Sequence, residues 1–174
     1  SQAVVDWGLQ LMGADYITGK LISHLNWSAD TSPIFNQSSR NNPQLAEWIA
    51  YAKNLVDAYA FVRPFLLEGQ LLRPLPGSFD LMFDTAMQMT KPWTSVWKRA
   101  NGVVGIVLTN PHALPKQFGG TIALSRYGFS EGQSVAVTLT STANNSTAWG
   151  NIADTLDMSQ FTVPPKGVLL IELQ

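Results

Sequence analysis

The chain contains 174 residues, and 11 Lys and Arg residues against 12 Asp and Glu residues give it a formal net charge of −1. This balance excludes a general binder of the nucleic-acid backbone, which would carry a basic excess. The absence of cysteine excludes disulfides, thiolate zinc sites and cysteine nucleophiles, and two histidines are too few for a multi-histidine metal site. We therefore expect no nucleic-acid partner, no metal and no cofactor.

Hydrophobic residues make up 45% of the sequence and charged residues 13%, which is typical of a folded chain. The length fits one domain or two small domains that share an interface. No apolar run approaches the roughly 18 residues that a membrane span requires, so no span is expected. The lack of cysteine suits an extracytoplasmic protein, periplasmic or secreted, and we expect that location, although many cytosolic proteins share this feature.

The first elements are expected to be short. Residues 4–12 suit a helix, and residues 19–27 suit a buried strand that runs into a polar turn. At the end of that strand, His24, Asn26 and Trp27 combine a ring that can stack on a sugar with two groups that can bind hydroxyls. We consider them candidate substrate-binding residues. The alternative is a strand end with a packed Trp and a turn-forming Asn.

The clearest helix begins after the polar loop of residues 28–42, because Asn42 suits the N-cap and Pro43 the first helical position. Steps of three and four residues predict one apolar stripe, opposite a polar face with Glu47, Lys53, Asn54 and Asp57. The stripe consists of Leu45, Trp48, Ile49, Ala52, Leu55, Val56 and Tyr59. Pro64 predicts a kink or break, and Gly69 suits a left-handed C-terminal cap.

Acidic residues of the first half are candidate catalytic groups, because glycosidic bond hydrolysis needs two opposed carboxyl groups. Asp80 and Asp84 would share one helix face at a spacing of four residues. The alternative is that both are ordinary solvated acids of a connecting segment, and we favour it because most surface acids have no special role. The catalytic residues therefore remain unassigned.

The sequence changes character near residue 90, where short β-rich runs replace the helical spacing. Strands are expected over residues 93–99, 103–109, 121–125, 134–140, 161–163 and 167–173. Asn101 and Gly102 predict a type I′ hairpin between the first two strands. The fold class is therefore α+β, with a helical segment over residues 1–90 packed on a Greek-key-like antiparallel β-sandwich over residues 91–174.

Aromatic residues of the second half have two interpretations. Trp93 and Trp97 point to the same side of one strand, and we favour packing at the helix–sheet junction over a sugar-stacking platform. Trp149 is expected in a loop and is the better candidate for an exposed, substrate-binding ring, although isolated exposed aromatic residues are normal. His112 is expected to be an ordinary loop residue, since no nearby carboxylate would orient it as a base.

Three stretches resemble the C-terminal end of retaining glycoside hydrolases of the α-galactosidase-like or α-amylase-like kind. Residues 55–69 (LVDAYAFVRPFLLEG) resemble the last helix of the TIM barrel in such enzymes. Residues 97–110 (WKRANGVVGIVLTN) resemble the first hairpin of their Greek-key β-domain, and residues 163–172 (VPPKGVLLIE) resemble its closing strand. By the same analogy, residues 21–27 stand for a late barrel strand whose end faces the substrate.

The resemblance implies a structural β-domain and chemistry located mostly outside this chain. A TIM barrel typically needs about 250 residues, and fewer than 90 precede the β-rich part. We therefore expect the rest of a barrel as partner, and no glycosidase turnover from the isolated chain. The alternative function is a non-catalytic carbohydrate-binding or interaction module.

Overall fold

A computed structural model describes residues 13, 16, 43–78, 91–142 and 146–174 of the chain. The first full element is helix α2 (Pro43–Leu66), and the short strand β1 (Gln70–Leu71) follows it. The remaining elements are β2 (Trp93–Lys98), β3 (Val104–Asn110), β4 (Lys116–Gln117), β5 (Thr121–Ala123), η3 (Leu124–Tyr127), β6 (Val135–Ser141), β7 (Thr147–Ile152), β8 (Thr155–Asp157), η4 (Met158–Gln160), β9 (Thr162–Val163) and β10 (Gly167–Leu173). The elements predicted over residues 4–12 and 19–27 lie outside the described residues.

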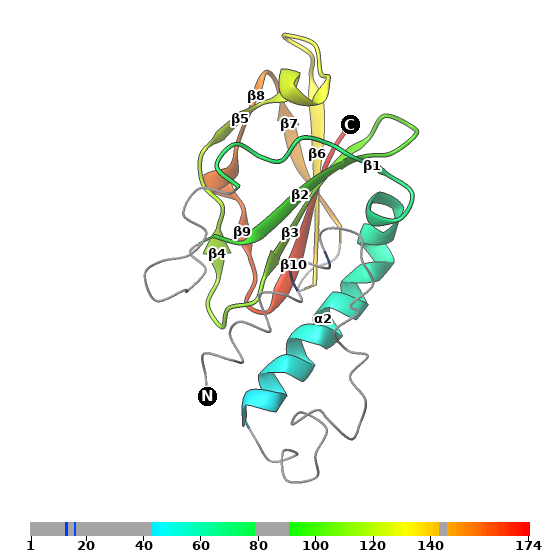
Figure 1. Cartoon of the computed structure of the whole chain (residues 1–174). Coiled ribbons are helices and arrows are strands. Elements are labelled where there is room, and N and C mark those ends of the chain that lie inside the picture. The colour runs from blue at the N-terminus through cyan, green and yellow to red at the C-terminus, as the bar shows by residue number, and fades with distance from the viewer. Residues whose placement is uncertain (1–12, 14–15, 17–42, 79–90, 143–145) are drawn as a thin grey trace.

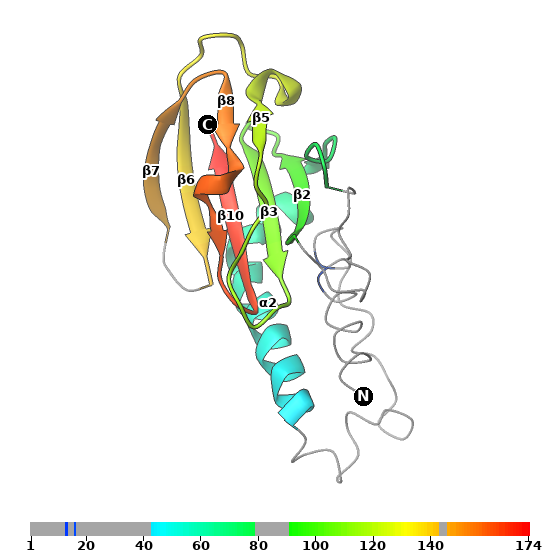
Figure 2. The same cartoon turned by 90° about the vertical axis from the view of Figure 1, so that its left-hand side faces the viewer.

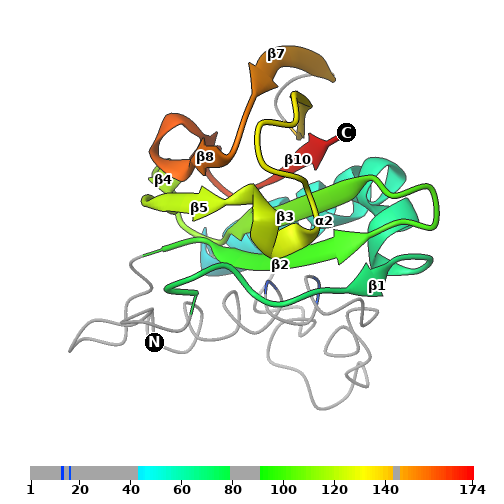
Figure 3. The same cartoon turned by 90° about the horizontal axis from the view of Figure 1, so that it is seen from above.

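The main sheet has six strands in the order β1-β2-β3-β10-β6-β7, and every neighbouring pair is antiparallel. The closing strand β10 therefore lies between β3 and β6. Two short ladders, β4-β9 and β5-β8, form the second layer of the sandwich. Figure 1 shows α2 running obliquely beside this sandwich, and Figure 3 shows β7 and β1 at opposite margins of the sheet. The fold is α+β with a C-terminal β-sandwich, as predicted.

The sheet separates two cores because successive side chains of a strand point to opposite faces. On β3, Ile106 and Leu108 point into the sandwich, while Val107 points toward α2. The same alternation on β10 sends Leu169 into the sandwich and Leu170 toward the helix. Figure 2 shows the consequence, with α2 on one side of the main sheet and the short ladders on the other. Both faces of the central strands are covered, which explains their continuous apolar sequences.

The helix buries a different stripe from the predicted one. Leu55 is fully buried as expected, but Ile49 is 59% and Val56 62% exposed. The side chains that pack on the sheet are Tyr51, Leu55, Ala58, Val62, Phe65 and Leu66, with Ala52 and Tyr59 at the margin. The prediction was wrong because the helix is apolar on two opposite sides, and periodicity alone cannot tell which side meets the sheet.

The end of α2 also differs from the prediction. The helix continues through Pro64 to Leu66, since that proline lies in the last turn. Gly69 does not adopt a left-handed conformation. A Cβ atom at Gly69 would lie 2.4 Å from the carbonyl oxygen of Phe65, so this position needs glycine for close approach. Its N–H donates to that same oxygen over 2.9 Å, which closes the helix.

The β2–β3 hairpin forms at the predicted place but with a different turn. Lys98 pairs with Val104, which leaves a longer connection than a two-residue turn. Gly102 donates its N–H to the carbonyl oxygen of Arg99 over 2.9 Å and has φ +89°, whereas Asn101 does not adopt a positive φ. This geometry is a turn followed by a left-handed glycine, typical of a three-residue hairpin loop with a bulge.

The remaining predicted strands are present in the structure, and one of them is shorter than predicted. The predicted strand over residues 121–125 ends at Ala123, and the turn η3 begins at Leu124. The predicted strands over residues 134–140, 161–163 and 167–173 correspond to β6, β9 and β10. In the part of the chain that the structure describes, no helix combines the length and the apolar character needed to cross a membrane.

Candidate functional site

Most of the residues singled out from the sequence cannot be placed in the structure. His24, Asn26 and Trp27 lie outside the described residues, and so do Asp80 and Asp84. Trp149 is the one predicted substrate-binding residue that is described. Across the described ranges, no group of three His, Asp or Glu side chains could hold a metal ion.

Trp149 lies in the edge strand β7 and not in a loop, so that prediction is corrected. Val137 of β6 pairs with Gly150, while the next residue of β6, Thr138, pairs with Ala148. Trp149 is therefore the extra residue of a β-bulge, which breaks the regular alternation of the strand. Gly150 has φ +153°, a value that residues with a side chain rarely adopt, so glycine suits this bend.

The Trp149 ring packs on the sandwich core while part of it stays accessible. Its centroid lies 5.2 Å from that of Phe161, with the two rings tilted by 57°. Phe161 is only 2% exposed, whereas Trp149 is 39% exposed. The arrangement fixes the orientation of the indole and leaves one portion of the ring available to a ligand.

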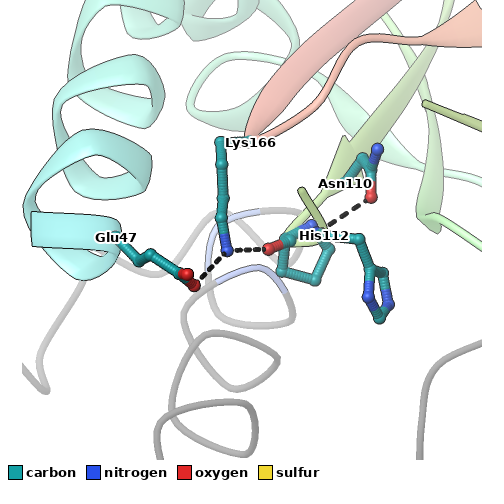
Figure 4. A network of polar contacts seen from close by, with 5 residues as sticks. Glu47, Asn110, His112 and Lys166 are labelled. Carbon is teal, nitrogen blue, oxygen red and sulfur yellow. Dashed lines mark hydrogen bonds and ion pairs between the residues drawn. The ribbon is translucent and has the colours of Figure 1, made fainter. Parts of the chain in front are cut away.

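A second constellation, at the other end of the sheet, was not predicted from the sequence (Figure 4). Lys166 donates from Nζ to Glu47 Oε2 over 3.2 Å and to the carbonyl oxygen of Pro111 over 2.6 Å. Its own carbonyl oxygen accepts from Asn54 Nδ2 over 2.7 Å. The Lys166 side chain is 14% exposed. This network joins the first half of α2 to the loops after β3 and β9, so Glu47 and Asn54 do not simply face solvent.

Lys166 itself sits in a tight turn. The N–H of Gly167 donates to the carbonyl oxygen of Pro164 over 3.1 Å, and Lys166 has φ +49°. A positive φ at the third position is typical of a type II turn, in which glycine is usually preferred. Lysine at this position therefore costs about 1 kcal/mol of backbone strain. The Pro-Pro-Lys-Gly sequence could have revealed the turn, but not the partners of the lysine.

Two substitutions of Lys166 separate the effect of its backbone strain on stability from the effect of its side-chain hydrogen bonds. Lys166→Met keeps the strain and removes the contacts of Nζ, so we expect it to lower the free energy of unfolding by about 1 kcal/mol. Lys166→Gly loses the same contacts but relieves the strain, so its stability should lie close to that of the wild type. Urea denaturation of both variants measures the difference. Equal losses for both variants would contradict the assignment.

Asn110 anchors the same region from the interior. Its side chain is fully buried, and Nδ2 donates to the carbonyl oxygens of Leu114, Val163 and Pro164 over 2.8, 3.3 and 3.1 Å. Its Oδ1 accepts from the N–H of His112 over 3.0 Å. His112 lies in the loop after β3, as predicted, and its carbonyl oxygen accepts from the N–H of Lys166. These bonds are structural and satisfy backbone groups where two loops cross.

Four of the described acids have different surroundings. Glu68 is exposed, and Asp57 forms an exposed ion pair with Lys53 along the helix. Asp157 caps the turn η4 by accepting from Ser159, and these hydrogen bonds lower the pKa of its carboxyl group. Glu172 is half-buried on the helix-facing side of β10, and burial raises its pKa while Arg99 partly opposes this.

Glu172 predicts a pH dependence of stability. Because its pKa in the folded chain lies above the ordinary value of 4.5, its favourable contribution is complete below pH 4.5 and is lost as pH rises through the folded pKa. Glu172→Gln removes this loss. We expect the variant to gain stability relative to the wild type between pH 4.5 and 7, as measured by denaturation at several pH values. A difference independent of pH would contradict this.

The junction between α2 and the sheet is aromatic, as predicted. Trp97 is buried and Trp93 partly buried in the core that contains the helix, and Trp97 Nε1 donates to Ser95 Oγ over 2.7 Å. The buried Tyr51 faces this core, and burial raises the pKa of its hydroxyl, so it stays neutral. A Cβ atom at Gly13 would lie 2.7 Å from the Tyr51 hydroxyl, so Gly13 closely approaches the helix α2. These side chains therefore hold the two layers together.

No protein-family model matches the sequence, and no curated protein matches it. Solved structures that match parts of the chain include three glycoside hydrolases, all with low TM-scores. A β-L-arabinopyranosidase from Geobacillus stearothermophilus is 12% identical, over 98% of this chain and 30% of that one, with a TM-score of 0.41. An arabinofuranosidase from Xanthomonas axonopodis is 14% identical over 70% and 26%, with a TM-score of 0.34.

An α-galactosidase from Mortierella vinacea is 17% identical, over 47% of this chain and 20% of that one, with a TM-score of 0.32. The chain thus spans between a fifth and about a third of the length of these three enzymes.

Proposed function

We propose that the chain is the C-terminal portion of a glycoside-hydrolase-like protein and that its β-sandwich has a structural role. The observation that carries this proposal is that α2 is apolar on two opposite sides. One side packs on the sheet through residues such as Leu55, while the other presents Ile49, Val56 and Leu67, which are 59%, 62% and 53% exposed. A line of exposed apolar side chains opposite the packed side favours a second apolar layer in a larger protein.

The spacing of these exposed side chains supports a second contact surface. Positions 49, 56, 60 and 67 fall on one line of an α-helix at 3.6 residues per turn, opposite the sheet. Ala60 is the small member of this line and is also exposed. We call Ile49, Val56, Ala60 and Leu67 the outer stripe. The resemblance of residues 55–69 to a last barrel helix implies that the outer stripe packs against the rest of a TIM barrel.

The interior of the sandwich favours a structural role for this part of the chain. Its core is apolar throughout, with residues such as Ile106, Phe118 and Leu156 almost completely buried. None of the described acids belongs to this core. In this proposal the catalytic carboxylates lie mostly on other segments of the protein, and hydrolysis of a glycosidic bond would follow the two-carboxylate mechanism.

Substitutions on the two sides of α2 test the structural half of the proposal. Ile49→Gln and Val56→Gln should leave the free energy of unfolding of this chain nearly unchanged and reduce its self-association, because the outer stripe is exposed and belongs to neither described core. The matched substitution Leu55→Gln on the inner side should cost about 3 kcal/mol or more. If the outer substitutions destabilise as strongly as Leu55→Gln, the chain is a self-contained module.

A turnover assay tests the catalytic half. The isolated chain should not hydrolyse aryl-glycosides, because the carboxylate pair is placed mostly outside it. Robust turnover that Asp80→Asn or Asp84→Asn abolishes would show that the chemistry resides in this chain. Circular dichroism of both variants serves as the control that they fold.

A further inference from the structure

The bulge in the edge strand β7 indicates what kind of partner this edge of the sheet can bind. An edge strand with regular pairing could accept another strand, but a bulge twists the edge and disrupts that pairing. In β7 the bulged residue is Trp149, and Gly150 follows it with φ +153°. This margin is therefore poorly suited to a strand from a partner. It is better suited to a ligand that contacts the indole ring.

The platform beneath the ligand position is rigid. Trp149 rests on Phe161 with a centroid distance of 5.2 Å, and Phe161 is anchored in the sandwich core at 2% exposure. A fixed aromatic ring loses little conformational entropy when a ligand stacks on it. The exposed 39% of Trp149 is the accessible portion. We call Trp149 and Phe161 the aromatic platform.

Neutral polar side chains neighbour Phe161 in the chain, and hydrogen bonds already orient them. Ser159 and Gln160 precede Phe161, and both donate to the Asp157 carboxylate, over 2.6 and 3.3 Å. On the other side of Phe161, the hydroxyl of Thr162 accepts from Gln117 Nε2 over 3.1 Å. All of these side chains except Asp157 are exposed. Such amide and hydroxyl groups can donate to and accept from sugar hydroxyls.

The charge around the platform selects against anionic ligands. Residues 147–163 contain Asp154 and Asp157 but no Lys or Arg. The strand β4, which pairs with β9, contributes one cation, Lys116, opposite Val163. An ionised Asp157, four residues before Phe161, would disfavour a phosphate or a uronate at this surface. A neutral ligand with an apolar face and several hydroxyl groups fits this surface best.

We propose that the aromatic platform, together with Ser159, Gln160 and Thr162, binds neutral carbohydrate by stacking a pyranose ring on Trp149. The apolar carbon–hydrogen face of the sugar lies on the indole, and the neighbouring polar side chains bind its hydroxyls. This site is formed by the sandwich alone. It therefore stands whether or not the chain belongs to a longer hydrolase.

Affinity electrophoresis of the whole chain tests the proposal. The native protein is run in gels that contain a soluble β-glucan, a soluble galactomannan or the anionic polygalacturonate. We expect at least one of the two neutral polysaccharides to retard the wild type and polygalacturonate to have no effect. Trp149→Ala should weaken the retardation about tenfold or more, while Trp149→Phe should retain part of it.

The matched control is Leu114→Ala, which removes another apolar side chain, 70% exposed, from the loop between β3 and β4. It should leave the retardation unchanged. The proposal is overturned if neither neutral polysaccharide retards the folded wild type, if Trp149→Ala is retarded equally, or if polygalacturonate binds as well. A loss of thermal stability in Trp149→Ala without any retardation of the wild type would show that the ring only covers Phe161.

Discussion

Gly105→Ala is expected to lower the free energy of unfolding by about 2 kcal/mol, because it overpacks the contact between β3 and α2. A Cβ atom at Gly105 would lie 2.5 Å from two carbon atoms of the Phe65 ring. Phe65 cannot move away easily, since it is 1% exposed and Arg99 lies over its ring at 5.6 Å. Urea denaturation followed by circular dichroism measures the loss.

A double variant provides the control for this contact. Phe65→Leu removes part of the ring and should itself destabilise the chain through a cavity. In Gly105→Ala/Phe65→Leu the added methyl group fills part of that space, so the two losses should sum to more than the loss of the double variant. Simple additivity of the losses, or no effect of Gly105→Ala, would contradict the proposed close contact.

Asn110→Ala is expected to cost about 2 to 4 kcal/mol, which makes it the most damaging of the polar substitutions considered. The side chain donates to three carbonyl oxygens and accepts from one N–H where the loops after β3 and β9 cross. Truncation removes all four bonds at a largely buried crossing, and each lost bond costs about 1 kcal/mol. The carbonyl oxygen of Pro164 keeps another donor, the N–H of Gly167. Asn101→Ala is the matched control, because Asn101 is exposed and accepts one bond from Val103. Equal losses for the two variants would refute this account.

Asn110→Asp adds a pH dependence to the same experiment. The new carboxylate would face three carbonyl oxygens in a buried site, which raises its pKa above the ordinary value. The variant should therefore be most stable at low pH, where the group is protonated, and should lose stability as pH rises through its folded pKa. Denaturation at pH 4 and pH 7 measures this slope, which Asn110→Ala should not show.

The central strands could be predicted from the sequence because both of their faces are covered. β2, β3 and β10 are continuous β-rich runs bounded by Gly, Asn and Pro, and their predicted and observed limits agree to within a residue or two. The start of α2 likewise follows from Pro43, whose ring suits the first helical turn. The class of the fold follows from these local signals.

The edge of the sheet and the packing of the helix could not be predicted in the same way. β7 is exposed along nearly its whole length, so its sequence carries no alternation that marks a strand. The bulge at Trp149 depends on its register with β6, and the polar network of Lys166 depends on residues more than fifty positions away. None of these partners is visible in a local sequence pattern.

The sequence alone therefore determined the class of the fold, the central strands, the aromatic junction and the exposure of Trp149. Only the tertiary structure decided which side of α2 meets the sheet, which glycines allow close approach and where the Trp149 ring rests. The physical reason is the range of the interactions. Strand and helix signals arise within a few residues, whereas a helix with two apolar sides can be assigned only when its partner surface is present.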